Sequence, residues 1–243
     1  MENKSYNFFL ILVCLVFFLG CGQHVVHYSS QKCNVHPLID GKIDSIWALI
    51  PHVKLHNYNL GEKYVTDSMD LSANYRMCWD MENLYILVTV IDDKVFDIRK
   101  FSYVTDIPAN YDCDCVELFF DMNNDKGGYG TFDLLDDDFR FEFVFGGRYI
   151  GGSYKTSANI NYQFAESEKG YLCEISIPFQ TLGITPAVDT EFGFEISIND
   201  NDDSPSSPMY NFEKRSIISW SQVKGVNAWQ NPSLFGNVFL IGN

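Results

Sequence analysis

Short apolar runs separated by turn residues are the feature that most constrains how this chain can fold. The runs are rich in β-branched and aromatic residues, and Gly, Asn, Asp and Pro stand between them. This pattern is typical of strands, and no interior segment predicts a helix with conviction. We expect strands over Asn83–Ile91, Asp114–Asp121, Phe139–Phe145, Tyr171–Ile177, Phe192–Asn199 and Gly236–Ile241. The sequence therefore predicts an all-β fold, an antiparallel β-sandwich of jelly-roll type in a single domain.

Charged residues inside these runs are the exception to the apolar pattern. Glu117, Arg140 and Glu142 each lie within a predicted strand. A buried charge is unfavourable unless it is paired, so two interpretations remain open. The three side chains either face solvent on an outer sheet surface, or they lie on a concave face that meets a ligand.

The N-terminus carries an export signal. Phe8 to Leu19 is an apolar run of twelve residues, followed by Gly20 and Cys21. A membrane-spanning helix needs about 20 residues, so the run suits the core of a signal peptide. A small residue before a cysteine indicates a bacterial lipoprotein signal, with lipid on Cys21; ordinary secretion is the alternative. We therefore expect a signal peptide over residues 1–20, a tether over 21–35 and a domain over 36–243. The expected location is the bacterial cell envelope, at the outer membrane or its periplasmic side.

Charge limits the possible partners. The net charge of -15 disfavours nucleic acid and anionic membrane surfaces, and the expected contact with a membrane is only through the lipid anchor. Neutral sugars and divalent cations remain compatible, and we expect a monomer.

The cysteines do not form a recognisable metal site or a complete set of pairs. Beyond Cys21 there are five, which is an odd number: Cys33, Cys78, Cys113, Cys115 and Cys173. Cys113 and Cys115 lack the spacing and the second pair of a zinc site. Cys78 and Cys173 stand in apolar strand patterns, and we expect them to be small core residues.

Several sequence blocks occur in an order and spacing that resemble a known family. They are IDGKIDSIW at 39–47, Asn83-Leu84-Tyr85 with Asp92, Asp114-Cys115-Val116-Glu117 with Asp121, Phe139-Arg140, Glu174 to Pro178 with Leu182-Gly183, Asn199-Asp200, Ile218-Ser219-Trp220, and Trp229 to Gly236. Together they resemble a family 9 carbohydrate-binding module. The resemblance implies a β-sandwich with calcium sites, which holds one or two sugar units of a plant-type polysaccharide or oligosaccharide in a slot between two aromatic rings.

The resemblance also implies which residues bind the sugar. By position, the two rings are Tyr111 and Trp229, and Glu117 and Arg140 bind hydroxyl groups. Asn227 stands beside Trp229 in a polar turn, where an indole is poorly explained as a core residue. Two departures concern the ligand: Tyr111 replaces the family's tryptophan, and Ser197 replaces an amide.

The chemistry of these residue types suits a sugar. A pyranose has apolar faces, which aromatic rings cover, and a rim of hydroxyl groups. Glu117 can only accept hydrogen bonds, whereas Arg140 can only donate them. Tyr111 can alternatively be an ordinary surface tyrosine, and Glu117 and Arg140 can pair with each other when no sugar is bound.

Calcium is a further expectation, as a structural ion. Asp121, Asn123 and Asp125 space oxygen donors at every second residue, which resembles the first half of a calcium loop. A plain hairpin turn is the alternative. Residues 136–138, and Asp200, Asp202 and Asp203, are other candidates, with solvated loops as their alternative.

Three other functions compete with sugar binding. A glycoside hydrolase would need two carboxylates, for which Glu117 and Glu142 are conceivable. Haem binding would need ligands among the five histidines, which precede most of the predicted strands. An adhesion or scaffold module would leave Trp229 unexplained. The sequence therefore favours non-catalytic carbohydrate binding.

Overall fold

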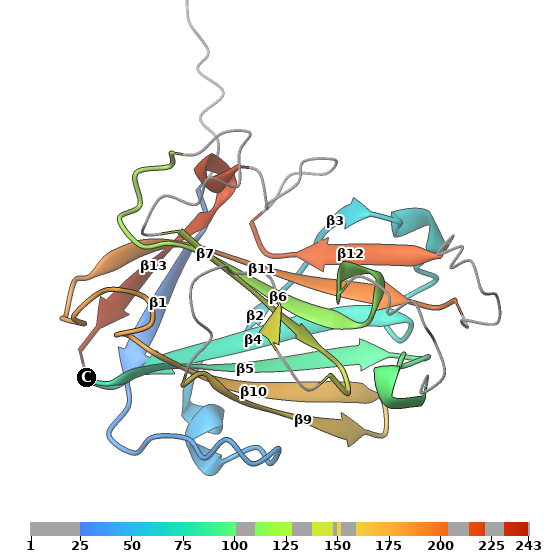
Figure 1. Cartoon of the computed structure of the whole chain (residues 1–243), viewed down its shortest axis with the longest axis horizontal. Coiled ribbons are helices and arrows are strands. Elements are labelled where there is room, and N and C mark those ends of the chain that lie inside the picture. Colours follow the sequence, from blue (N-terminus) through green and yellow to red (C-terminus); the bar gives the residue numbers. More distant parts are fainter. Residues whose placement is uncertain are drawn as a thin grey trace, which may run out of the picture.

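The computed structural model describes residues 25–100, 110–127, 138–147, 150–151, 159–203, 214–221 and 231–242 (Figure 1). The predicted signal peptide and Cys21 lie outside these residues. Helical structure in the described residues consists of short 3-10 turns, namely η1 (Ser45–Leu49), η2 (Glu62–Tyr64), η3 (Ile98–Lys100), η4 (Asn110–Asp112) and η6 (Pro232–Leu234). None of the helices in these ranges has the length and apolar character needed to cross a membrane.

Strands dominate the fold. They are β1 (His27–Lys32), β2 (Val53–Lys54), β3 (Asn57–Leu60), β4 (Leu71–Trp79), β5 (Asn83–Asp92), β6 (Cys115–Asp121), β7 (Asp138–Val144), β8 (Ile150–Gly151), β9 (Asn161–Ser167), β10 (Gly170–Pro178), β11 (Glu191–Asn201), β12 (Arg215–Ser219) and β13 (Gly236–Ile241). Their main order is β8-β7-β6-β11-β13-β1-β4-β5-β10-β9, with β12 on β11, β3 on β12 and β2 on β4. The six predicted strands all form, with ends within two residues of the predicted ones.

The connected sheet folds over on itself, so that its two halves enclose one core. Alternate residues of β4, such as Tyr75, point into this core, and so do Val116, Leu118 and Phe120 of β6. The Tyr75 ring lies 5.7 Å from the ring of Phe194 on β11, which belongs to the other half. Each half thus buries its apolar face against the other, which is the arrangement of a sandwich and confirms the predicted fold class.

The first strand corrects two details of the prediction. β1 pairs in parallel with β13 and with β4, so the sheet is mixed and not wholly antiparallel. In Figure 1, β1 and β13 run side by side at the left of the molecule. Residues 27–32 were expected to lie in the tether, but they form an integral strand that joins the two halves. Its sequence HYSSQK is polar, yet Tyr28 and Ser30 alternate into the interior, and that alternation is the physical reason for the difference.

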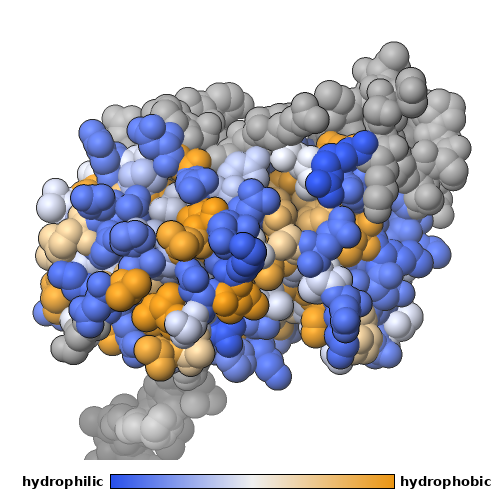
Figure 2. All heavy atoms as spheres, turned by 90° about the horizontal axis from the view of Figure 1, so that it is seen from below, coloured by the Kyte–Doolittle hydropathy of each residue, from blue (hydrophilic) through white to orange (hydrophobic). Residues whose placement is uncertain are grey.

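On the face seen in Figure 2, apolar residues are interspersed with hydrophilic ones. Single exposed apolar side chains are normal on protein surfaces. We therefore look for a site where polar side chains are buried, because burial of polar groups is the more informative signal.

Candidate functional site

A row of polar side chains crosses the sheet on the face of β6, β7 and β11 that points away from the core. Glu117 lies directly opposite Glu142 on β7 and Ser197 on β11. Ser197 in turn lies opposite Ser219, and Ser219 opposite Asn57. Directly opposed residues share one face of a sheet, so five strands contribute to this polar row. The strand register, which joins distant parts of the sequence, places these groups together.

Arg140 links the two carboxylates at one end of the row. Its Nη2 atom donates to Glu117 Oε1 at 2.6 Å and also forms an ion pair with Glu142. Glu117 and Glu142 are each only 5% exposed. The charged side chains are therefore buried and paired, and the interpretation that they face solvent is wrong for Glu117 and Glu142. Burial raises the pKa of Glu142, while Arg140 and Asn110 lower it.

Two amide side chains complete this network. Asn199 Nδ2 donates to Glu117 Oε2 at 2.7 Å, and Asn110 Nδ2 donates to Glu142 Oε2 at 2.7 Å. The set comprises one cation, two carboxylates and two amides; we call it the Arg140 network. The sequence left open that Glu142 lies on a face that meets a ligand, but it gave no sugar-binding role to Asn110 or Asn199. The strand registers supply the missing signal, since they place Glu142 and Asn199 beside the predicted residues.

Tyr111 lies next to this network on the 3-10 turn η4, and its side chain is 46% exposed. The guanidinium of Arg215 lies over its ring at 5.6 Å, and Arg215 also pairs with Asp112. The turn is held further by Asn201, whose Nδ2 donates to Asp112 O at 2.6 Å. A half-exposed ring on a fixed turn can form one wall of a slot.

The other predicted wall lies outside the described residues, which do not include Trp229 or Asn227. The residues that flank this part of the chain are firmly tied. Ser221 donates from its backbone N–H to both oxygens of Glu195, at 3.1 and 3.0 Å, and its Oγ donates to Leu234 O at 2.8 Å. Glu195 is fully buried, and burial raises its pKa to about 7. Trp229 and Asn227 therefore remain predictions.

A second group of buried acids lies at one end of β5, β6 and β11. The carboxylates of Asp92, Asp114 and Asp200 approach one another within 4.8 Å. Asp200 is 3% exposed, and its Oδ1 atom has no hydrogen-bond partner within the described ranges. Burial raises the pKa of Asp92 to about 6, with smaller increases from Asp202 and Asp93. Burial and the charge of Asp92 raise the pKa of Asp200 to about 8. Burial likewise raises the pKa of Asp114. An uncompensated set of oxygen donors with an orphaned buried oxygen fits a hard divalent cation such as Ca²⁺.

The turn that was expected to bind calcium has a different character. Within it, Asp125 Oδ1 accepts from Gly127 N at 2.7 Å, and Asn123 Oδ1 accepts from Asp125 N at 2.8 Å. Asp121 Oδ2 accepts from Lys126 N at 3.1 Å. Burial raises the pKa of Asp121, and the hydrogen bond and charge of Lys126 oppose part of this increase. These contacts are those of a hairpin turn, although Asp121 Oδ1 has no hydrogen-bond partner within the described residues, and Lys126 Nζ donates to Phe235 O and Asn237 Oδ1 outside the turn.

The competing chemistries find little support in the described residues. His27, His36, His52 and His56 are all exposed, which does not suit haem ligands. Glu117 and Glu142 contact each other and share Arg140. Glycosidases hold their two carboxyl groups about 5 Å or more apart, with the scissile bond between them. The carboxylate pair of the Arg140 network is therefore unsuited to hydrolysis.

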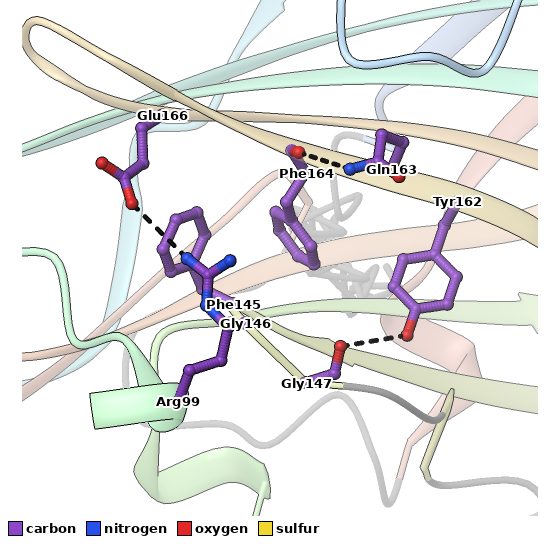
Figure 3. Close-up of a pocket in the computed structure, with 8 residues that line it drawn as sticks. All are labelled: Arg99, Phe145, Gly146, Gly147, Tyr162, Gln163, Phe164 and Glu166. Atoms are coloured by element: carbon purple, nitrogen blue, oxygen red, sulfur yellow. Dashed lines mark hydrogen bonds and ion pairs between the residues drawn. The ribbon is translucent and has the colours of Figure 1, made fainter. Parts of the chain in front are cut away.

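A pocket of about 480 Å³ lies elsewhere, between the end of β7 and the edge strand β9 (Figure 3). Its lining includes Arg99, Phe145, Tyr162, Phe164 and Glu166. In Figure 3 the Arg99 side chain reaches toward Glu166, and Tyr162 reaches toward Gly147. None of the predicted sugar-binding residues that the structure describes lines this pocket. It is thus separate from the Arg140 network.

Comparison with known proteins identifies the family of this chain. The profile of the carbohydrate family 9 binding domain-like family matches residues 39–243. Endo-1,4-beta-xylanase A of Thermoanaerobacterium saccharolyticum is 31% identical over 228 residues, which cover 91% of this chain and 17% of the xylanase. Exoglucanase XynX of Acetivibrio thermocellus is 32% identical over 210 residues, which cover 85% of this chain and 16% of that enzyme. The chain thus spans about a sixth of the length of these relatives.

Solved structures give the same result. A family 9 carbohydrate-binding module from Caldicellulosiruptor kristjanssonii, in complex with cellotriose, has a TM-score of 0.68 and 25% identity, and the match covers 89% of this chain and 94% of that one. A glucose complex of a module from the same organism has a TM-score of 0.67, with 25% identity and coverage of 89% and 96%. Because the family profile covers most of the sequence and these folds agree, this chain belongs to the carbohydrate family 9 binding domain-like family.

Proposed function

We propose that this domain binds the sugar units of a plant-type polysaccharide or oligosaccharide beside the Arg140 network, and that it does not cleave them. The observation that carries the proposal is the network itself. Arg140 is held between Glu117 and Glu142, and each carboxylate also accepts a hydrogen bond from an amide side chain. The complexes of the similar modules with cellotriose and glucose support a saccharide as the ligand.

The network has the composition that recognition of hydroxyl groups needs. A sugar hydroxyl both donates and accepts, so it can bridge a carboxylate and a guanidinium or amide group. Hydrogen bonds to charged groups contribute about 1.5–3 kcal/mol each, and a fixed network has little side-chain freedom to lose. Tyr111 would cover one apolar face of the sugar, and Trp229, beside Asn227, would cover the other.

We further propose that Ca²⁺ is held by Asp92, Asp114 and Asp200, and not by Asp121, Asn123 and Asp125. When bound, the ion would neutralise the repulsion among three buried carboxylates. Asp114 follows shortly after Tyr111, and its Oδ1 accepts from Asn201 N at 3.0 Å, while Asn201 Nδ2 also binds Asp112 O. These contacts connect the acidic group to the turn that carries Tyr111. The bound ion would therefore have a structural role, because it would fix the turn at the edge of the sugar site.

Export with a lipid on Cys21 is the proposed setting of this function. Its support is the apolar run that ends at Gly20-Cys21. Cys21→Ala should release the protein from the membrane fraction and remove the labelled acyl chain. A wild-type protein that carries no acyl chain would reject the anchor without bearing on sugar binding.

Titration calorimetry with xylo- and cello-oligosaccharides tests the binding proposal. The wild type should bind at least one of the two series and release no reducing ends from it. Trp229→Ala should weaken binding by about 2 kcal/mol, roughly thirtyfold, with little loss of melting temperature. Equal affinity in the variant would reject the slot assignment, and a large loss of melting temperature would place Trp229 in the core.

A further inference from the structure

The two halves of the sandwich meet at a narrow join on one side of β1. β1 pairs with β13 over five residues, from His27 to Gln31. On its other side it pairs with β4 only through Gln31 with Cys78 and Lys32 with Trp79. One further bond extends the join, from the backbone N–H of Cys33 to Trp79 O at 2.7 Å. Few backbone hydrogen bonds therefore connect the two halves near Cys33.

Two cysteines lie diagonally across this join, because Gln31 pairs with Cys78 and Cys33 follows Gln31 by two residues, on the same face. Cys33 is 6% exposed and Cys78 is fully buried, and both belong to a small apolar cluster that also contains Trp47. The other three cysteines are placed differently: Cys113 and Cys115 share a separate cluster, and Cys173 lies in the main core.

We propose that Cys33 and Cys78 form a disulfide bond in the exported protein, which fastens β1 to β4. Two adjacent buried thiols need little movement to join, whereas distant cysteines cannot be bridged without displacing the backbone. One such bond would leave Cys113, Cys115 and Cys173 as single buried thiols. Disulfides persist in oxidising environments, so this bond depends on the predicted export of the protein from the cytosol.

The reaction is an exchange with a disulfide donor, such as an exported dithiol oxidase or oxidised glutathione. One thiolate attacks the donor disulfide to form a mixed disulfide, and the second thiolate then displaces the donor sulfur. The S–S bond of the donor breaks and the Cys33–Cys78 bond forms. Two protons and two electrons pass from the cysteine pair to the donor, which leaves as two thiols.

The bond would stabilise the domain chiefly by restricting the unfolded chain, because it closes the long loop from Cys33 to Cys78. A reductant should therefore lower the melting temperature of the oxidised wild type by roughly 5–10 °C. Cys33→Ala and Cys78→Ala should each abolish this response to reductant. Cys173→Ala is the matched control, since it removes a buried thiol outside the pair and should keep the response.

Differential alkylation decides the question directly and needs no variant. The full chain, isolated after export and also purified and equilibrated with oxidised glutathione, is denatured, alkylated, reduced and alkylated with a second reagent before peptide mass spectrometry. We expect Cys33 and Cys78 to carry the second label, and Cys113, Cys115 and Cys173 the first. Cys33 and Cys78 with the first label in both samples would overturn the pairing. A pair that closes with glutathione but carries the first label after isolation from cells would overturn the bond in the exported protein.

Discussion

The two groups of buried carboxylates in this domain differ in how their charge is compensated. Glu117 and Glu142 share Arg140, and each also accepts a hydrogen bond from an amide. Asp92, Asp114 and Asp200 have no such cation among them, and Asp200 retains an unpartnered oxygen. The first group holds its own cation, and Asn199 Oδ1, which has no hydrogen-bond partner within the described residues, remains available to a hydroxyl group. The second group needs protons or a metal ion to be stable.

The largest effect is expected when the compensated group loses its cation. Arg140→Ala would leave two buried carboxylates without their cation, which typically destabilises a protein by about 3–5 kcal/mol. Urea denaturation measures this loss, and sugar binding should also disappear. Lys42→Ala is the control, because the side chains of Lys42 and its partner Asp40 are 83% and 43% exposed, and exposed pairs contribute about 1 kcal/mol or less. Equal losses in the two variants would contradict the central role of Arg140.

The second largest effect on stability is expected when calcium is removed from Asp92, Asp114 and Asp200. A ligand at 100 times its Kd stabilises the folded state by about 2.7 kcal/mol, which is roughly 5–10 °C in a domain of this size. Chelator should therefore lower the melting temperature of the wild type. In Asp200→Asn the response should vanish, and without metal this variant should melt no lower than the wild type, because repulsion is relieved. Asp125→Asn in the hairpin turn should respond as the wild type does; if it alone lost the response, calcium would belong to that turn.

The pH dependence of stability in the metal-free domain tests independently whether the charge of Asp92 and Asp200 is uncompensated. Burial raises the pKa of Asp92 to about 6 and that of Asp200 to about 8. Between the ordinary carboxyl pKa of about 4 and these values, the folded state holds more protons than the unfolded state, so stability should fall as pH rises. Melting curves in chelator from pH 5 to pH 8 check this. The fall should be smaller in Asp200→Asn and in saturating calcium; a flat profile in the wild type would indicate that these carboxylates are ionised at no loss of stability.

Tyr111→Ala should have the smallest effect on stability and a moderate one on binding. Its ring is 46% exposed, so truncation leaves no closed cavity. Loss of one apolar wall should weaken sugar binding by about 1–2 kcal/mol, less than the loss of an indole. Tyr111→Phe keeps the ring and should bind like the wild type. Calorimetry would contradict the stacking role if Tyr111→Ala kept full affinity.

The apolar alternation of the sequence was sufficient to predict the strands of the core. β13 begins and ends as predicted, and β5, β6, β7, β10 and β11 differ by one or two residues at their ends. β4 and β9 were not predicted, for different reasons. In β4 apolar and polar residues alternate from Leu71 to Met77, which is a readable signal of a half-buried strand, whereas β9 is a largely exposed strand at the edge of the sheet. The parallel position of β1 depends on long-range pairing, which local patterns do not encode.

The candidate site shows the same limit. Glu117 and Arg140 stood out as charges inside apolar strands, but their pairing with Glu142 depends on the register between β6 and β7. Asp92, Asp114 and Asp200 are far apart in sequence and meet only because three strand ends converge. The spacing of Asp121, Asn123 and Asp125 lies within one turn and could therefore be recognised in the sequence, and calcium at these residues stays a prediction. Spacing within one turn can be read from a sequence, whereas convergence of strands requires the fold.

The most direct test of the account is sugar binding by Glu117→Gln. Glutamine keeps the shape of the side chain and can still accept from Asn199, and Arg140 remains paired with Glu142, so the fold should be retained. Loss of a charge-assisted hydrogen bond of about 1.5–3 kcal/mol predicts at least a tenfold weaker Kd, measured by calorimetry with the oligosaccharide that the wild type binds best. An unchanged Kd in a variant that melts like the wild type would contradict the assignment of the sugar site to this face.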